Sequence, residues 1–185
     1  MQAGPVFFVV KHEFWGYNRD GKTHACEEYM TIRKAAKKDI PKIMDLLMQI
    51  HDLHAEARPD LFVPGIPKYS PEEVEAIMAK ESSPIFVAAD EKDEVLGYAF
   101  CIVKSNEGGV SLTDIKTMFI DDLCVDEKCR GQGIGKELVD YVVEAAKEYG
   151  CYNLTLNVWN LNDSAIRFYE KCGMKPMKTV MEKKL

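Results

Sequence analysis

The chain has 185 residues, 46% of them hydrophobic, and its 30 acidic against 24 basic residues give a net charge of -6. This size predicts one soluble domain with a well-buried core. The acidic balance disfavours nucleic acid as a partner, because that partner usually demands a basic face. No apolar run could span a membrane, and the run at 6–10 is too short for a signal peptide. Six cysteines without a C-x-x-C pair predict reduced thiols and a cytoplasmic protein.

The first segment, residues 1–28, matches no regular pattern, and three interpretations stay open. It is a tail, an extra edge strand, or sequence ahead of a domain that begins near Met30. We therefore divide the chain into an N-terminal extension of unknown role, 1–29, and one domain, 30–185.

The domain starts with a strand at Thr31–Arg33, and a helix follows at Ala36–His54, where apolar residues recur at helical spacing. Three prolines and a glycine make Arg58–Tyr69 a loop. Ser70 and Glu73 form a capping box, and Pro71 takes the first position of a short helix.

The second half contains a hairpin, Ile85–Ala89 with Val95–Lys104, and then a turn at 105–111. A buried strand is predicted at Met118–Val125, a helix from Lys136 to Tyr149 that stops at Gly150, and a strand at Asn153–Val158. These elements predict an α/β (α+β) fold with a mixed, mostly antiparallel central sheet and helices on both faces.

A glycine-rich turn joins the buried strand to the helix. Gly131, Gly133 and Gly135 alternate along the chain, so no side chains keep an anion from the backbone N–H groups at the start of the helix. A diphosphate is the expected ligand. The turn is not a P-loop, because Arg130 and Glu137 stand where glycine and a hydroxyl residue are required. It is not a dinucleotide fingerprint either, because Lys136 replaces the third glycine.

Two motifs carry a family resemblance. The pattern Arg130-x-x-Gly133-x-Gly135, after a strand ending Leu-x-Val, resembles the acetyl-CoA pyrophosphate motif of the GNAT superfamily of N-acetyltransferases. The block from Asn162 to Met174 resembles the later motif of the same family. The resemblance covers roughly Met30 to Leu185 and is nearest to the diamine and polyamine acetyltransferase-like members.

This resemblance implies a GNAT-like fold, acetyl-CoA as co-substrate and no metal. Homodimers are common in the family, so a homodimer is among the expected partners, together with an amine substrate and neither nucleic acid nor membrane. The residues expected to contact the coenzyme are Leu123, Cys124, Val125, Arg130, Gly131, Gln132, Gly133, Ile134, Gly135, Lys136, Asn162 and Ala165.

Two catalytic residues are expected. An alkylamine has a pKa of about 10.4, so some group must accept its proton before it attacks a thioester. Asp121 and Asp122 are adjacent and should point to opposite faces of a strand, so only one can meet the substrate. In the resembling enzymes the first of the pair often faces the amine, which makes Asp121 the amine binder or a water-linked base. The alternative is a carboxylate bonded to neighbouring backbone or to a lysine.

Tyr169 stands where the family's tyrosine protonates the leaving thiolate. The alternative is a core stripe shared with Ala165, Phe168 and Cys172. Backbone N–H groups near Leu123 and Cys124 would stabilise the oxyanion if the strand bulges there. For Asn162, helix capping and a contact with the pantetheine arm both stay open.

The hypothesis from the sequence is direct transfer of an acetyl group to a primary amine, with a small cationic amine first, a protein N-terminus or lysine next and an aminoglycoside third. An inactive coenzyme-binding sensor is the alternative from another class. His51 and His54 share a helix face but lack further ligands at metal-binding spacing, so no metal site is expected.

Overall fold

The computed structural model describes residues 8–17, 23–105 and 113–185, with the backbone alone for 8–17 and 23–29. The turn expected at 105–111 lies almost entirely outside this range.

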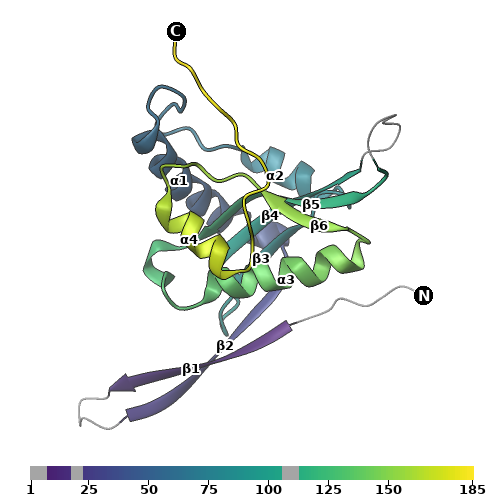
Figure 1. Ribbon diagram of the computed structural model, residues 1–185. Helices are drawn as coiled ribbons and strands as arrows, with labels where there is room; N and C mark the ends of the chain where they lie inside the picture. The colour runs from purple at the N-terminus through teal and green to yellow at the C-terminus, as the bar shows by residue number, and fades with distance from the viewer. Residues whose placement is uncertain (1–7, 18–22, 106–112) are drawn as a thin grey trace.

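A six-stranded sheet in the order β1-β2-β3-β4-β5-β6 forms the centre of the domain (Figure 1). Every neighbouring pair is antiparallel except β5 and β6, which are parallel. The expected mixed, mostly antiparallel sheet is therefore confirmed. The strands are β1 Phe8–Tyr17, β2 Thr23–Lys34, β3 Ile85–Ala89, β4 Val95–Ser105, β5 Lys116–Val125 and β6 Asn153–Leu156.

Helices cover both faces of the sheet, as expected. Helix α3 packs on one face, and α1 with α2 packs on the other. Each interface is a buried apolar cluster, centred on Leu138 and Val142 for α3 and on Leu46 and Val74 for α1 and α2. The helices are α1 Ile40–Ala57, α2 Pro71–Met78, α3 Ile134–Glu148 and α4 Asp163–Lys171, with short 3-10 turns η1 at Lys37–Asp39 and η2 at Glu127–Cys129.

Several predicted boundaries need correction. Helix α1 begins at Ile40 instead of Ala36, because Pro41 lacks an N–H and suits the first helical turn, while residues 37–39 form a 3-10 turn. Strand β6 ends at Leu156, two residues before the predicted end. The capping box is confirmed: Ser70 Oγ accepts from Glu73 N, and Glu73 Oε2 accepts from Ser70 N.

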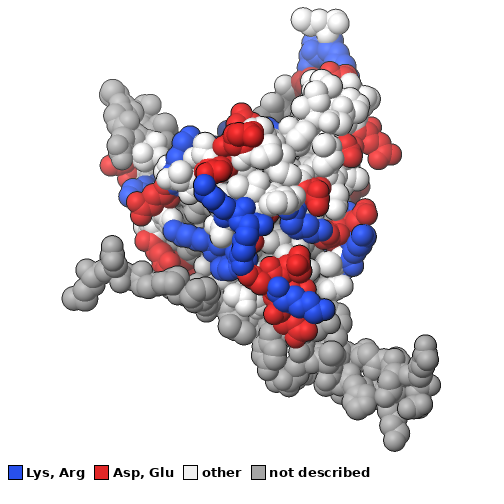
Figure 2. Space-filling model, turned by 180° about the vertical axis from the view of Figure 1, so that it is seen from behind, with Lys and Arg blue, Asp and Glu red and all other residues white. Residues whose placement is uncertain are grey.

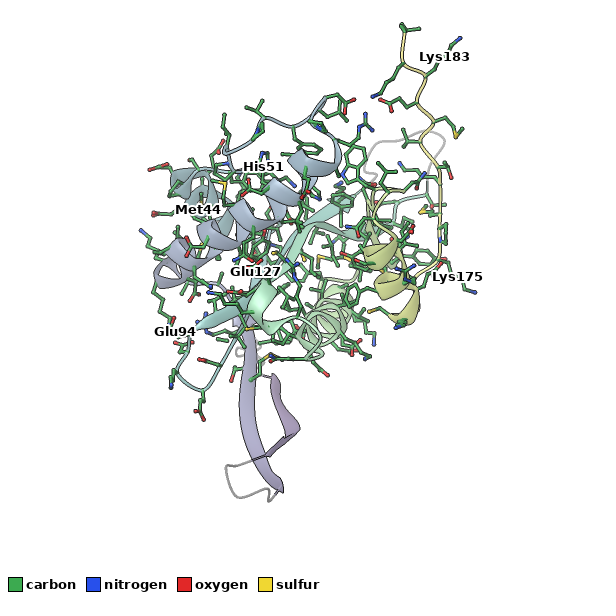
Figure 3. The ribbon with its side chains drawn as sticks, turned by 90° about the vertical axis from the view of Figure 1, so that its left-hand side faces the viewer. Met44, His51, Glu94, Glu127, Lys175 and Lys183 are labelled. Atoms are coloured by element: carbon green, nitrogen blue, oxygen red, sulfur yellow. The ribbon has the colours of Figure 1, made fainter. Side chains whose placement is uncertain are left out.

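The first strand of the domain is longer than Thr31–Arg33. Strand β2 starts at Thr23 and pairs along its length with β1, so the proposed boundary at residue 30 falls within a continuous strand. Of the three interpretations of the N-terminal segment, an extra edge strand matches Phe8–Tyr17. Figure 3 shows this two-stranded ribbon extending away from the rest of the domain.

Charges of both signs are interspersed on the face shown in Figure 2. Oppositely charged side chains form ion pairs in the structure: Lys37 pairs with Glu75, and Lys38 pairs with Asp93. In the described ranges, no helix is both long and apolar enough to cross a membrane.

Candidate active site

The glycine-rich turn leads from the end of β5 through η2 into α3. Gly131 has φ of +80° and Gly133 has φ of +84°, a backbone conformation that other residues adopt only with strain. Gly133 is the N-cap of α3, and its carbonyl accepts from Lys136 N and Glu137 N. The sequence-based interpretation of a strand, a glycine turn and a helix start is therefore correct in its local structure.

The backbone N–H groups of the turn have no acceptors among the described residues. Cys129 N donates to Asp126 O, and the next N–H with an acceptor in the described part of the chain is that of Lys136. Six consecutive N–H groups, from Arg130 to Gly135, are thus left for a ligand or water. At a helix N-terminus such groups form an anion site, since the helix dipole adds to their partial positive charge. The Arg130 side chain turns back toward the strand, with Nε donating to Val125 O at 3.2 Å.

The third glycine has a different role from the other two. A Cβ on Gly135 would lie 3.2 Å from Cζ of Phe168, in α4. Our expectation that all three glycines clear space for an anion is therefore wrong for Gly135, whose missing side chain instead lets α4 pack against the first turn of α3.

Strands β5 and β6 separate beside this turn. They pair only from Thr117 with Asn153 to Ile120 with Leu156. Beyond that point, residues 122–125 of β5 have ladder partners on β4, and residues 121–125 have none on β6 among the described residues. Half of the backbone groups of a strand point toward each neighbour, so this edge of β5 presents unpaired N–H and C=O groups. Leu123, Cys124 and Val125, expected to contact the coenzyme, are on this edge.

A β-bulge interrupts β5 at Asp121. Phe100 pairs with Asp122 and Cys101 pairs with Ile120, which leaves Asp121 without a partner residue on β4. The extra residue reverses the alternation of side chains along the strand. Ile120 therefore packs in the cluster under α3, whereas Cys124 packs in the cluster under α1.

The bulge corrects the prediction that Asp121 and Asp122 point to opposite faces. Both carboxylates approach one cation: Lys68 Nζ lies 2.8 Å from Asp121 Oδ2 and 3.9 Å from Asp122 Oδ2. Tyr69 also donates its hydroxyl to Asp121 Oδ2, at 2.6 Å. The sequence missed this arrangement because simple alternation cannot reveal a bulge.

The two carboxyl groups differ in their environment. Burial acts to raise the pKa of Asp121, but the hydrogen bonds from Lys68 and Tyr69 outweigh it and hold the pKa below its usual value. The Asp122 side chain is only 9% exposed, and burial raises its pKa to about 6 although the Lys68 ammonium opposes the shift. Its Oδ1 accepts from the hydroxyl of the fully buried Tyr98 at 3.4 Å.

Tyr169 lies on α4, half-buried beside Phe168, with the two rings in an edge-to-face arrangement at 5.0 Å. Burial raises the pKa of its hydroxyl, and the Asp122 carboxylate raises it further, so the two groups lie close enough to interact. No described residue forms a hydrogen bond with this hydroxyl. Tyr169 therefore carries a protonated hydroxyl at neutral pH that is available to a ligand.

Asn162 caps α4, which is one of the two roles left open for it by the sequence. Its Oδ1 accepts from Ala165 N at 3.0 Å and from Ser164 Oγ at 3.2 Å. This use of the side-chain oxygen satisfies one of the unpaired N–H groups of the helix start.

The two histidines of α1 support a loop. His51 Nε2 lies 2.6 Å from Val63 O, and the His54 ring packs against Phe62. Figure 3 shows His51 on α1. The loop they support, residues 58–69, carries Lys68 and Tyr69 to the carboxylates. No group of three or more metal-ligating side chains occurs in residues 30–105 and 113–185.

The Acetyltransferase (GNAT) family model matches residues 47–174, which include the turn, the bulged strand and α4. The chain belongs to this family. A solved structure with the same fold is a tetramutant of the BH1408 protein from Bacillus halodurans, which is 31% identical at a TM-score of 0.79 over 83% of this chain and 99% of that one. The expected GNAT fold is thus confirmed.

Curated relatives match shorter stretches of the chain. Glucosamine 6-phosphate N-acetyltransferase of Arabidopsis thaliana is 37% identical over 68 residues, 37% of this chain and 44% of the relative. Peptidyl-lysine N-acetyltransferase YjaB of Escherichia coli (strain K12) is 30% identical over 93 residues, half of each chain. The chain therefore matches about half the length of these relatives.

Proposed function

We propose that this GNAT protein transfers an acetyl group from acetyl-CoA directly to a primary amine, and that the preferred acceptor is a small cationic amine. The observation that carries the proposal is the run of six N–H groups without acceptors among the described residues, next to the open edge of β5. An anion at the turn and an amide-bearing chain along the edge would satisfy these groups together. A pyrophosphate joined to a pantetheine arm has this combination of chemistry.

The donor site takes its residues from the two motifs. The N–H groups of residues 130–135 would bind the pyrophosphate, and the free edge at Leu123 to Val125 would pair with the amides of the pantetheine arm. The exposed Lys136 adds positive charge beside the turn, although it also pairs with Asp140. We assign Asn162 and Ala165 to the wall of the same site, since the cap between them shapes the start of α4.

The acceptor side combines two carboxylates with aromatic rings. Tyr69 stacks on Phe100 at 5.5 Å, and Phe100 meets Tyr98 edge to face at 5.1 Å. Carboxylates beside aromatic faces recognise an alkylammonium by charge and by cation–π attraction. We therefore assign Asp121 to binding of the acceptor ammonium.

The proton of the ammonium must leave before the nitrogen attacks the thioester carbon. With a pKa of about 6, Asp122 is better matched than Asp121 to accept a proton near neutral pH. The new C–N bond forms and the nitrogen loses its second proton to water. The C–S bond breaks, and the thiolate takes a proton from the Tyr169 hydroxyl, which recovers one from water. Unpaired N–H groups at the bulged edge of β5 would stabilise the oxyanion in between.

A peptidyl lysine is the second candidate for the acceptor. Three large apolar side chains of the loop next to the carboxylates, Leu61, Val63 and Ile66, are more than half exposed. They suit contact with a peptide better than contact with a short polyamine. The name of the relative YjaB points to the same class of acceptor.

The experiment is the release of free coenzyme A thiol from acetyl-CoA across a panel of amines. The panel contains an aliphatic diamine, a polyamine, glucosamine 6-phosphate, an aminoglycoside and a lysine-containing peptide. We expect turnover with the diamine or polyamine and a fall in kcat of about 100-fold in Tyr169→Phe, with unchanged coenzyme affinity.

The control is Tyr152→Phe, because Tyr152 is 77% exposed. Turnover with the peptide alone would favour the second candidate. Coenzyme binding without turnover on any amine would indicate a sensor, and no coenzyme binding would refute the assignment of the turn.

A further inference from the structure

Lys68 fills the space in front of both carboxylates. Its Nζ donates to Asp121 Oδ2 at 2.8 Å and to the backbone carbonyl of Asp121 at 3.0 Å, and it lies 3.9 Å from Asp122 Oδ2. The carbonyl belongs to the bulge residue, so the ammonium is held at the strand edge to which we assign the reaction. The side chain reaches this place from the loop of residues 58–69.

The surroundings of Lys68 Nζ are those of an alkylammonium site. The ring of Tyr69 has its centroid 5.3 Å from the nitrogen, within the range of a cation–π contact. Two carboxylates, a carbonyl oxygen and an aromatic face therefore converge on one cation. A lysine side chain is itself a primary alkylamine, and it has the same recognition chemistry as the acceptor proposed above.

The Lys68 side chain can also move away from the two carboxylates. It is 39% exposed, whereas Asp122 is 9% exposed, so the carboxylates belong to the sheet and the cation comes from the surface. If the ammonium of an acceptor displaced Lys68, the Lys68 ammonium would be hydrated at the surface. The two carboxylates would then pair with the ammonium of the acceptor.

We propose that Lys68 is an internal occupant of the acceptor site, whose ammonium fills the position of the acceptor's ammonium until a cationic amine displaces it. This inference rests on the proposed function and adds a specificity-determining residue to it. A neutral amine cannot replace the charge that Lys68 supplies, so the acceptor class narrows to alkylammonium ions. The apparent affinity for the acceptor is lowered by the fraction of time for which Lys68 occupies the site.

The test is Lys68→Met, which keeps most of the length of the side chain and removes the ammonium. We expect KM for the cationic amine to fall about tenfold, the factor imposed by an internal competitor that is bound about nine-tenths of the time. KM for acetyl-CoA should stay within about twofold, because the contacts of Lys68 are with Asp121, Asp122 and Tyr69, which lie outside the donor site assigned above. Lys68→Arg keeps a cation and should retain the high KM.

The matched control is Lys104→Met. Lys104 is exposed on β4, its ammonium lies 3.3 Å from the centroid of the Phe119 ring, and its charge acts on Asp121 without a hydrogen bond. A fall in KM with both variants would mean that general charge near the site is responsible, and it would overturn the proposal. A rise in KM with Lys68→Met would overturn it too, because Lys68 would then bind the acceptor. Absence of turnover by the wild-type enzyme on any amine would instead refute the proposed function.

Discussion

Gly97 of β4 and Cys124 of β5 are in such close contact that a Cβ on Gly97 would lie 2.8 Å from the Cys124 carbonyl oxygen. The same Cβ would lie 3.3 Å from Leu138 Cδ1, so the glycine also lets α3 approach the sheet. The contact lies between β4 and the part of β5 whose other edge we assign to the coenzyme.

Gly97→Ala should therefore destabilise the protein by about 1–3 kcal/mol, because two backbones must move apart to admit the methyl group. Chemical denaturation measures the loss. Gly135→Ala is a graded comparison: its nearest neighbour is the far end of a ring, and alanine favours a helix over glycine by about 1 kcal/mol. A loss at Gly135 as large as that at Gly97 would contradict this interpretation.

Gly133→Ala should lower the affinity for acetyl-CoA about tenfold. The left-handed backbone of Gly133, with φ of +84°, costs a residue with a Cβ about 1–2 kcal/mol, and the turn would relax away from the anion. Isothermal titration calorimetry measures the affinity. Gly150→Ala is the matched control, since Gly150 has φ of +69° at the other end of α3, and no described atom lies within 4 Å of the place that its new methyl group would take. Equal losses of affinity in both variants would exclude a local role for the turn.

Asp122 should make stability depend on pH in a direction that is unusual for an aspartate. Its pKa is raised from 3.8 to about 6 in the folded protein, so between these values the native state holds a proton that the unfolded state has lost. The free energy of unfolding therefore falls as pH rises through this window, by about 3 kcal/mol for this group. Asp122→Asn should flatten that part of a stability curve measured by urea denaturation from pH 4 to 7, and an unchanged slope would count against the raised pKa.

Asp39 and Asp93 share one arginine and should differ in importance. Arg33 contacts Asp39 through two nitrogens at 2.7 and 2.9 Å and contacts Asp93 at 2.7 Å. The Asp39 side chain is 2% exposed and that of Asp93 is 47% exposed. Asp39→Ala should cost about 3–5 kcal/mol, because it removes the buried partner of a partly buried cation and also the acceptor of the Ala36 N–H. Asp93→Ala should cost at most about 1 kcal/mol. Thermal denaturation of the two variants checks the order.

Local sequence patterns predicted the parts of the site that depend on neighbouring residues. The turn at Gly131 and Gly133, the capping box at Ser70 and the cap at Asn162 each involve groups within a few positions of one another. The backbone freedom of glycine and the capping of a helix depend only on neighbouring residues, so both can be predicted directly from the sequence.

The acceptor side could not be predicted in the same way. Whether Asp121 forms a bulge depends on the register of β4 at Phe100 and Cys101, which no pattern within β5 reveals. Lys68 and Tyr69 reach Asp121 from 53 and 52 positions away, by way of a loop held by His51. These contacts are set by tertiary structure. The role that the sequence suggested for Asp121, and that for Tyr169, remain predictions.

The bulge at Asp121 also makes the register of β5 against β4 a determinant of the chemistry. If the bulge were lost while Asp121 is kept, by a slip of one residue, Ile120 and Asp122 would lie on the same side of the sheet, with Asp122 under α3. Such a slip would preserve every side chain of the strand and still exchange a charged surface for an apolar one. A change in the register of β5 should therefore alter function more than most substitutions in this strand would.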